Sequence, residues 1–542
     1  MPTLHWIGKD KVINHHREVP FKVLEHAYGF SAEQGRADAP TGSGNMVVHG
    51  DNLEALKALL PRYEGRVKCI YIDPPYNTGN EGWVYNDNVN DPKIRRWLHQ
   101  VVGKEGEDLS RHDKWLCMMY PRLVLLHKLL RDGGIIFVSI DDAEVFNLKF
   151  LMDEIFAPSN FQHQIVWKNK YGPGALTKGI GSVHEYILCY SKGPLSSIQA
   201  NLSEEEIEKY TGRDENYATR GGYITQPLAT TSKDDRPNLV FPLVHEGEEI
   251  WPDKQWIWSR ARVQEAYDKG WLQLRKSKDK WSVRFKQYLK DEQGQLRRAK
   301  PISILNGPFN QDGTAEQVAI FGKKTFDNPK PSELVKYLCS FILNDEDDRS
   351  GIYLDSFAGS GTTAHAVLNL NKQDGGDRRF ILVEMEDYAE TITAERVRRV
   401  MQGYGSEKKK VEGTGGAFDY YMLGPRLFDE HHNLNEEVAV EKIREYVWYT
   451  ETRTDIHEIP GQARNDKRKK DTPYLLGTHE DTAYYFVYEK ERLTVLDYDT
   501  LALLKTKAAH YVIYADNCIL PQRFLEEHHI TFKKIPRDIS RF

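Results

Sequence analysis

Residues 351 to 370 read GIYLDSFAGSGTTAHAVLNL, where an apolar run, a glycine-rich turn and a helix-forming run follow one another directly. The apolar run predicts a buried strand, and Gly359 and Gly361 let the backbone turn sharply and pass close to a ligand. Such a ligand would meet the N-terminus of the following helix, where free N–H groups point outward. A G-x-G turn can also serve tight packing alone, so this stretch predicts an α/β fold and leaves the ligand to other features.

Apolar runs and helix-forming runs alternate on both sides of this stretch. MVVHGD (46 to 51), VKCIYID (67 to 73), IIFVSID (135 to 141) and RRFILVEM (378 to 385) read as strands, whereas NLEALKALLPRY (52 to 63) and AEVFNLKFLMDEIF (143 to 156) read as helices. The strand runs do not alternate between apolar and polar residues, which is typical of strands covered by helices on both faces. We therefore expect a doubly wound, mainly parallel sheet.

Three further runs carry more specific expectations. KWLCMMYPRLVLLHKLLRDGG (114 to 134) predicts a helix that ends at Gly133 and Gly134, with Pro121 marking a kink or a helix start. QIVW (164 to 167) and EYILCYS (185 to 191) predict strands that lie antiparallel at the sheet edge. PSELVKYLCSFIL (331 to 343) predicts a helix.

The composition is that of a globular protein with several domains. The chain has 542 residues, 40% of them hydrophobic, and this length predicts roughly two to four domains. The five cysteines lie far apart without a C-x-x-C pair, which argues against a zinc cluster and a disulfide framework. We see no signal peptide and no run near the roughly 18 apolar residues of a membrane helix, so we expect a soluble, cytoplasmic protein without a metal site.

The regularity of the chain fades between residues 195 and 300 and then resumes. We expect an N-terminal extension (1 to 44), half of an α/β domain (45 to 194), an insertion (195 to 300), the second half (301 to 404), a Gly- and Lys-rich linker (402 to 417) and a separate small α/β domain (418 to 542). The net charge is −6, yet residues 272 to 300 carry ten Lys or Arg against three Asp or Glu. This run is either a solvated surface or a nucleic-acid contact.

Polar side chains follow two of the expected strands. Asp73, Pro74, Pro75 and Tyr76 come at the end of the strand 67 to 73, and Glu384 ends the strand after the glycine turn. A carboxylate in the latter place can accept hydrogen bonds from a ribose, although it can also be a solvated strand end. Ligands of open α/β sheets bind outside the carboxyl ends of the strands, so both features can face one crevice. The chain has no G-x-x-x-x-G-K-[ST] motif, which argues against a P-loop ATPase.

DPPY (73 to 76) followed by FAGSG (357 to 361) resembles the amino-group DNA methyltransferases, in the permuted order of the beta class. DPPYNTG, FVSIDDAEVFNLKFLMDEIF (137 to 156) and FDNPKPSELV (326 to 335) resemble the modification (Mod) subunits of type III restriction systems. The resemblance covers roughly residues 45 to 400. It implies a circularly permuted, Rossmann-like methyltransferase sheet with an inserted target-recognition domain.

The resemblance also implies a reaction, namely methyl transfer from S-adenosylmethionine to an exocyclic amine of a flipped-out base in double-stranded DNA. Asp73 and the carbonyl of Pro74 would accept hydrogen bonds from the amine, the two prolines would hold that carbonyl stiffly, and Tyr76 would stack on the base. Asp rather than Ser at position 73 favours adenine N6 over cytosine N4. Cytosine C5 chemistry is disfavoured, because it needs a thiolate after a proline and none of the five cysteines follows one.

Other expected contacts fall into two groups. For the cofactor we expect Asp51 (which is equally plausible as a helix N-cap), Lys330, Pro331, Ser332, Asp355, Phe357, Ala358, Gly359, Gly361, Thr362 and Glu384, with Lys330 near the methionine carboxylate and Glu384 at the ribose. For DNA we expect Asn77, Lys168, Lys170, Arg275, Lys276, Lys278, Lys280 and Arg284, mostly in the basic run and in the loop 168 to 179.

The family implies partners as well. Type III modification subunits dimerise and join a helicase-nuclease subunit, which gives the segment 418 to 542 a plausible interaction role, although its aromatics fit a buried core equally well. Two readings of a different class remain open, a DNA-recognition scaffold with weak or dormant methyl transfer, and methylation of an RNA or protein amine.

Overall fold

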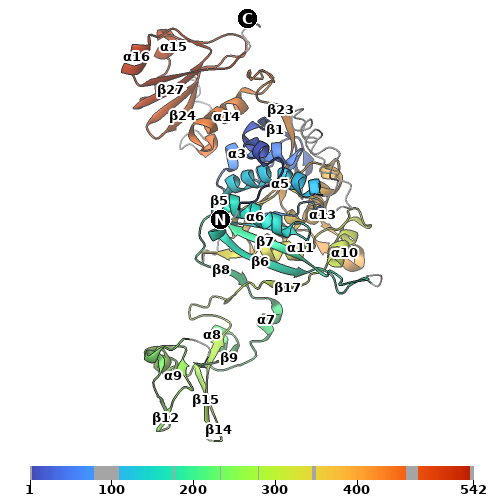
Figure 1. The fold of residues 1–542 in the computed structure, drawn as a ribbon, viewed down its shortest axis with the longest axis vertical. Helices are drawn as coiled ribbons and strands as arrows, with labels where there is room; N and C mark the ends of the chain where they lie inside the picture. The colour runs from blue at the N-terminus through green and yellow to red at the C-terminus, as the bar shows by residue number, and fades with distance from the viewer. Residues whose placement is uncertain are drawn as a thin grey trace. The chain divides into compact units, whose positions relative to one another are not determined.

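The computed structural model describes residues 3–78, 109–174, 178–231, 234–278, 280–344, 349–458 and 474–537. The chain forms two compact units (Figure 1), one made of Met1–Ile198 with Ile302–Phe542 and the other of Gln199–Pro301. The second unit covers nearly the same residues as the irregular region between 195 and 300. Within the described ranges, no helix is long and apolar enough to cross a membrane.

The first unit is built on one eleven-stranded sheet in the order β17-β6-β7-β5-β4-β19-β20-β3-β23-β1-β2. Its central strands β5, β4, β19, β20, β3 and β23 are parallel, whereas β7 runs antiparallel to β5 and β6. The expected doubly wound, mainly parallel sheet is confirmed, as is the antiparallel pairing of the strands at 161 to 191. The bounds are β1 Lys22–Ser31, β2 Gly35–Ala37, β3 Met46–His49, β4 Val67–Ile72, β5 Leu130–Ile140, β6 Phe161–Lys168, β7 His184–Ser191, β17 Ile304–Asn306, β19 Ser350–Asp355, β20 Asp377–Glu384 and β23 Ala417–Arg426.

Two groups of helices accompany the sheet. In one group α3 (Asn52–Tyr63) packs on α5 (Leu109–Leu129), which packs on α6 (Val145–Phe156). In the other, α12 (Thr362–Asp374) packs on α11 (Ser332–Cys339) and on α13 (Glu395–Gln402), and α10 (Asn310–Phe321) also packs on α13. From the neighbouring pair β4 and β19 the chain proceeds in opposite directions, to β5 and to β20, so right-handed crossovers place α5 and α12 on opposite faces. The switch point of the sheet therefore lies between β4 and β19.

The core explains why these runs form these elements. All six residues of β4 are buried, as expected for a strand covered on both faces. Leu56, Leu59, Leu123 and Leu126 of α3 and α5 lie fully buried in the same cluster as Ile70 and the other apolar residues on this face of the sheet. Each such leucine contributes about 1.5–3 kcal/mol of transfer free energy, so apolar burial fixes the strands whose ends carry the site.

Three features of the predicted helices differ from the sequence expectation. The helix around Pro121 is continuous from Leu109 to Leu129, so Pro121 does not start it. Gly133 and Gly134 do not cap that helix but lie in β5, where the register with β4 shifts and the Gly133 N–H donates to the carbonyl of Lys192 (2.7 Å). The run 331 to 343 is helical only to Cys339, and Ile342–Leu343 form the short strand β18.

Both flanks of the expected methyltransferase region join the main sheet. β1 pairs with β23, and β23 pairs in parallel with β3, so residues from the expected N-terminal extension and from beyond residue 417 complete the sheet. The expected linker (402 to 417) contains the paired strands β21 (Gly403–Tyr404) and β22 (Val411–Glu412). The prediction that a separate domain begins at residue 418 is therefore wrong, because β23 is hydrogen-bonded to β1 on one side and to β3 on the other.

The rest of the C-terminal part contains a small α/β arrangement. β24 (Leu475–His479), β25 (Thr482–Phe486), β27 (His510–Ala515) and β29 (Ile530–Lys534) form a four-stranded sheet in that order. The helices α14 (Val440–Thr452), α15 (Tyr498–Ala502) and α16 (Gln522–Glu527) accompany it. Many aromatics of this part, such as Trp448 and Tyr485, are buried. The charged run RNDKRKKD (464 to 471) lies outside the described residues.

The second unit has its own small core. The strands β14 (Leu272–Ser277), β15 (Lys280–Tyr288) and β9 (Tyr223–Pro227) form an antiparallel sheet, accompanied by α9 (Arg260–Asp268). Trp256, Val263, Leu272 and Val283 are buried together at its centre. The basic run therefore forms most of a β-hairpin.

Candidate active site

Four neighbouring strands of the main sheet each end in or next to a carboxylate. Asp73 follows β4, Asp355 ends β19, Glu384 ends β20, and Asp51 lies two residues after β3. These strands are parallel and adjacent in the order β4-β19-β20-β3, so all four side chains belong to the same edge of the sheet. The first two flank the switch point, where open α/β sheets bind their ligands. The structure thus brings together the two motifs that are 282 residues apart (355 − 73) in the sequence.

The DPPY turn contains a tightly connected polar cluster. The ammonium of Lys330 lies 3.1 Å from Oδ2 of Asp73 and 3.3 Å from Oε2 of Glu185. It donates to the hydroxyl of Tyr76 (2.8 Å), which in turn donates to Glu185 (3.0 Å). The second oxygen of Asp73, Oδ1, is buried and has no hydrogen-bond partner. Two protein carboxylates hold Lys330 in the structure, and its contact with a cofactor carboxylate stays a prediction.

The charges in this cluster are set by burial and by the ion pairs. Burial raises the pKa of Asp73 above its usual value, Lys330 opposes this change, and Glu185 adds to it. Burial alone would lower the pKa of Lys330, but the carboxylates of Asp73 and Glu185 raise it above its usual range. Lys330 is therefore a permanent cation at neutral pH.

The turn itself is fixed by residues that sequence reasoning missed. The indole N–H of Trp115, from α5, donates to the carbonyl of Pro75 (2.7 Å). Asn77 is 1% exposed, has a positive φ of 59°, and donates through Nδ2 to Oε1 of Glu144 (2.5 Å). The assignment of Asn77 to the DNA contacts is therefore wrong, because its amide is used inside the protein to anchor the end of the motif.

The glycine turn places backbone N–H groups on the two other buried carboxylates. Asp355 accepts from the N–H of Phe357 (3.0 Å) and from the hydroxyl of Thr363 (2.5 Å). Glu384 accepts from the N–H group of Gly359 (2.7 Å). It also accepts from the N–H groups of Met385 (2.9 Å) and Glu386 (3.0 Å), the two residues that follow Glu384 in the chain. Burial raises the pKa of Asp355 to about 7 and that of Glu384 to about 7. Both carboxyl groups are therefore poised between charge states near neutral pH.

The two glycines of the turn are needed for steric reasons. Gly359 and Gly361 have φ values of 50° and 82°, which side chains rarely adopt. A Cβ on Gly361 would lie 3.0 Å from the carbonyl oxygen of Thr393, and one on Gly359 would lie 3.1 Å from the ring of Phe326. Phe357 and Ala358 are 4% and 5% exposed, and Phe357 belongs to the apolar core, so their side chains serve packing here.

A buried ionic cluster supports the turn from behind. Arg396 of α13 is fully buried and donates to the hydroxyls of Ser360 (2.9 Å) and Thr362 (2.9 Å). It also forms an ion pair with Glu316 (2.7 Å), which accepts hydrogen bonds from the N–H and hydroxyl of Ser332. Thr362 and Ser332, both expected near a cofactor, thus belong to one network, with Pro331 as the N-cap of α11. Neither Arg396 nor Glu316 lies in a recognisable motif.

Asp51 caps α3. Its Oδ1 accepts from the N–H groups of Leu53 and Glu54 (both 3.0 Å), so the N-cap alternative is the one observed. The next residue, Asn52, donates to the carbonyl of Ser356 (3.2 Å) and accepts from buried Arg122 (2.5 Å). The start of α3 is in this way linked to the glycine turn.

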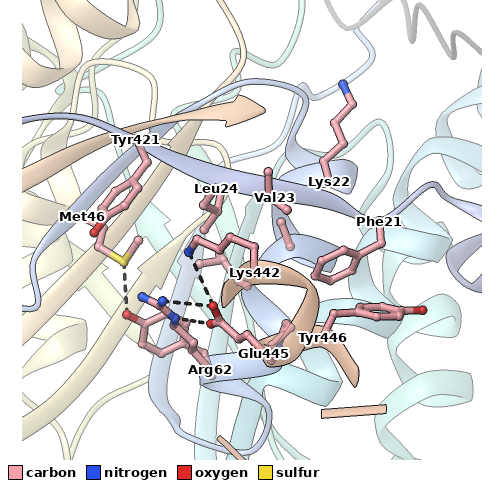
Figure 2. Close-up of a pocket in the computed structure, with 14 residues that line it drawn as sticks. Phe21, Lys22, Val23, Leu24, Met46, Arg62, Tyr421, Lys442, Glu445 and Tyr446 are labelled. Atoms are coloured by element: carbon pink, nitrogen blue, oxygen red, sulfur yellow. Dashed lines mark hydrogen bonds and ion pairs between the residues drawn. The ribbon is translucent and has the colours of Figure 1, made fainter. Parts of the chain in front are cut away.

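A surface pocket lies at the opposite end of the strands. Figure 2 shows it lined by Phe21, Leu24, Met46 and Tyr446 around the ion pair of Arg62 with Glu445. Met46 begins β3, whereas the carboxylates follow the strand ends. This pocket is therefore separate from the candidate active site.

The expected DNA contacts have different environments in the structure. Lys276 pairs with Glu248 (2.6 Å) and Lys280 with Asp253 (2.8 Å), while Arg275 and Lys278 are exposed. Arg284 donates to the hydroxyl (2.9 Å) and the backbone carbonyl (2.7 Å) of Thr225 on the neighbouring strand β9. Its side chain therefore joins β15 to β9 rather than facing solvent freely. Lys168 ends β6 and Lys170 is exposed; of the loop that follows, residues 175 to 177 lie outside the described ranges.

The chain is similar to one family model and to several known proteins. A family model described as a DNA methylase, of the N6/N4 type, matches residues 67 to 395. The Mod subunit of the type III restriction-modification enzyme StyLTI from Salmonella typhimurium is 34% identical over 358 residues, which cover 64% of this chain and 53% of that protein. The EcoPI Mod subunit of Escherichia phage P1 is 32% identical, covering 71% and 64%, and the type II methyltransferase M.KpnI of Klebsiella pneumoniae is 32% identical, covering 66% and 84%. The chain thus spans between half and two thirds of the length of the two Mod relatives.

Proposed function

Because this chain belongs to the DNA methylase family of N6/N4 type, we propose that it transfers a methyl group from S-adenosylmethionine to an exocyclic amine of a base in double-stranded DNA. The target that we propose is adenine N6. One observation carries the proposal: Asp73 presents a buried, unpartnered carboxylate oxygen beside the glycine turn, at the switch point of the sheet.

The residues of the site suit each part of this reaction. An exocyclic amine is a poor nucleophile, because its lone pair is delocalised into the ring. A hydrogen bond to Oδ1 of Asp73, and one to the carbonyl of Pro74, would favour a more pyramidal nitrogen whose lone pair can attack. Trp115 holds the second half of the turn through the carbonyl of Pro75. Tyr76 is partly exposed and can stack on a flipped-out base.

The glycine turn and the buried carboxylates fit the cofactor. Gly359 and Gly361 bring backbone close to the ends of β19 and β20, and α12 begins directly after them. The hydroxyl oxygen of Ser356 is buried and lacks a partner, and Glu384 uses three of its acceptor positions, which leaves a position for a ribose hydroxyl. When bound, S-adenosylmethionine supplies a methyl group on a positively charged sulfur. Asp73 and the carbonyl of Pro74 would hold the amine nitrogen while it takes this methyl group and gives up one proton to solvent.

The Gln199–Pro301 unit is the proposed target-recognition region. Arg275 and Lys278 offer exposed positive charge on the hairpin β14-β15. The similarity to Mod subunits supports a role as the modification subunit of a restriction system. We further propose that the protein forms a homodimer and joins a helicase-nuclease partner in the cytoplasm. A recognition scaffold with dormant transfer is the alternative.

The proposal is tested by incubating the protein with labelled S-adenosylmethionine and mixed-sequence duplex DNA. We expect label in N6-methyladenine for the wild type and none for Asp73→Ala. Specific DNA binding by the wild type without any label in adenine would favour the scaffold, and label in cytosine N4 would correct the target base.

A further inference from the structure

Lys330 occupies an unusual position for a cation, inside the acceptor site. Three acceptors surround its ammonium: Oδ2 of Asp73 at 3.1 Å, the hydroxyl of Tyr76 at 2.8 Å and Oε2 of Glu185 at 3.3 Å. The ammonium thus forms one hydrogen bond, to the hydroxyl of Tyr76, and two ion pairs. The side chain is only 9% exposed, and its charge lies 4.8 Å from the centre of the Tyr76 ring. Lys330 is therefore held in one place.

This contact makes the two oxygens of Asp73 different. Oδ2 is bound by Lys330, whereas Oδ1 is buried without a hydrogen-bond partner. A carboxylate that is held through one oxygen presents the other in a fixed direction, and fixed direction is what positioning contributes to catalysis. Oδ1 is the oxygen that the proposed function requires, and an entering base would displace the groups that bury it.

Glu185 connects this arrangement to the antiparallel strand β7. Its side chain is 14% exposed, and its Oε1 accepts from Nδ2 of Asn169 (2.6 Å). Its Oε2 accepts from the hydroxyl of Tyr76 (3.0 Å) and faces Lys330. Glu185 thus fixes both the cation and the aromatic ring.

Resting on the proposed function, we propose that Lys330 and Glu185 are positioning residues of the methyl transfer. Lys330 holds Oδ2 of Asp73 and leaves Oδ1 to accept a hydrogen bond from the target amine. Glu185 holds Lys330 against Asp73 and sets the plane of the Tyr76 ring. Lys330 keeps this role throughout, as part of the acceptor site and not as a ligand of the cofactor.

The two residues act on the charge of Asp73 in opposite ways. Lys330 lowers the pKa of Asp73, whereas Glu185 raises it, on top of the increase that burial causes. The amine needs an ionised acceptor, so the transfer rate should fall with decreasing pH as Asp73 becomes protonated. Removing the Lys330 charge should move this fall to higher pH, and removing the Glu185 charge should move it to lower pH. The titratable groups that face Asp73 are Lys330, Glu185, Tyr76, Tyr71 and Asp355.

The test compares the pH dependence of kcat for label transfer to duplex DNA in the wild type, Lys330→Met and Glu185→Gln. We expect the acid limb of Lys330→Met to lie about one pH unit or more above that of the wild type, and that of Glu185→Gln to lie below it. Lys9→Met and Glu154→Gln are matched controls, because Lys9 and Glu154 form an ion pair of 2.6 Å between α1 (Lys9–Val12) and α6 and do not act on Asp73. Both controls should keep the wild-type limb.

Each outcome decides the question. If the wild type methylates DNA and the acid limbs of the two variants stay at the wild-type pH, or both move in the same direction, the positioning role is overturned. If Lys330→Met is inactive at every pH, Glu185→Gln decides alone, because the amide keeps the shape of the side chain. A wild type that transfers no label at any pH overturns the proposed function itself, and the positioning role with it.

Discussion

Arg396 is the residue whose loss should damage the cofactor turn most. It is fully buried. Its guanidinium forms an ion pair with Glu316 (2.7 Å) and donates to the hydroxyls of Ser360 and Thr362 (2.9 Å each). His365 lies 3.2 Å from the guanidinium, and burial lowers the pKa of this histidine to about 4, so it is neutral at pH 7 in the wild type. Arg396→Met therefore leaves Glu316 without its charged partner in the interior.

Breaking a buried ion pair by removing one partner costs about 3–5 kcal/mol. With a melting shift of roughly 2 °C per kcal/mol, the unfolding midpoint of the first unit should fall by about 6 °C or more. The double variant Arg396→Met with Glu316→Met should melt above Arg396→Met alone, because no uncompensated charge remains. The affinity for S-adenosylmethionine, measured by calorimetric titration, should fall in both variants, since Ser360 and Thr362 lose the donor that holds the turn.

Arg399 is the matched control. It lies on the same helix and pairs with Glu395 at 2.7 Å, but its side chain is 40% exposed. Arg399→Met should cost at most about 1 kcal/mol, as exposed pairs do. If Arg396→Met melts no lower than Arg399→Met, or if the double variant is the least stable of the set, the buried charge is not what supports the turn.

Three other perturbations test separate features. Asn77→Ala should lower stability by about 1–3 kcal/mol, because buried Glu144 loses a donor, and should leave the salt dependence of DNA binding unchanged in titrations at several salt concentrations; a reduced dependence would restore Asn77 to the interface. Arg275→Ala should weaken DNA binding and reduce the slope of log affinity against log salt by about 0.9 per lost phosphate contact. Arg284→Ala should instead lower the melting temperature of the Gln199–Pro301 unit. If Arg284→Ala changes the salt slope and Arg275→Ala changes the melting temperature, the two roles are reversed. The pKa of Asp355 is raised to about 7 in the folded protein from its unfolded value near 3.8, so ionisation of Asp355 opposes folding and stability should be lost as pH rises from about 4 to 7. In melting curves measured across this pH range, Asp355→Asn should remove this part of the loss. Equal pH dependence in the two proteins would contradict the raised pKa.

The strands and the two motifs could be predicted because they depend on local features. The apolar run of β4 predicts a buried strand, and the glycines after β19 predict a tight turn, each from only a few consecutive residues. Because parallel strands end at one edge, placing Asp73 beside Asp355 needed only the sheet type. The prediction of the helix end at Gly133 failed for a local reason too, since a glycine with positive φ suits a strand irregularity as well as a helix cap.

The partners of the site could not be predicted, because they come from distant segments. Lys330 lies 257 residues after Asp73 (330 − 73), and Glu185 lies next to the start of β7, where no local motif marks it. Nothing local distinguishes Asn77 inside the protein from an Asn on its surface until Glu144 is seen beside it. Likewise, the run around β23 reads as the start of a new domain, and only its ladders with β1 and β3 show that it belongs to the sheet.

The ladder between β3 and β23 limits how this protein can be dissected. A fragment cut to residues 45 to 404, which the motifs alone would suggest, removes β23 and β1 together and leaves β3 as an open edge. Open, apolar edges pair with other chains and aggregate. Asp51 lies two residues after β3 and caps α3, and Asn52, the first residue of α3, donates to the carbonyl of Ser356 at the glycine turn, so fraying of this edge would reach the cofactor side of the site. A soluble minimal methyltransferase therefore has to keep residues 22 to 31 and 417 to 426, or receive a substitute strand in their place.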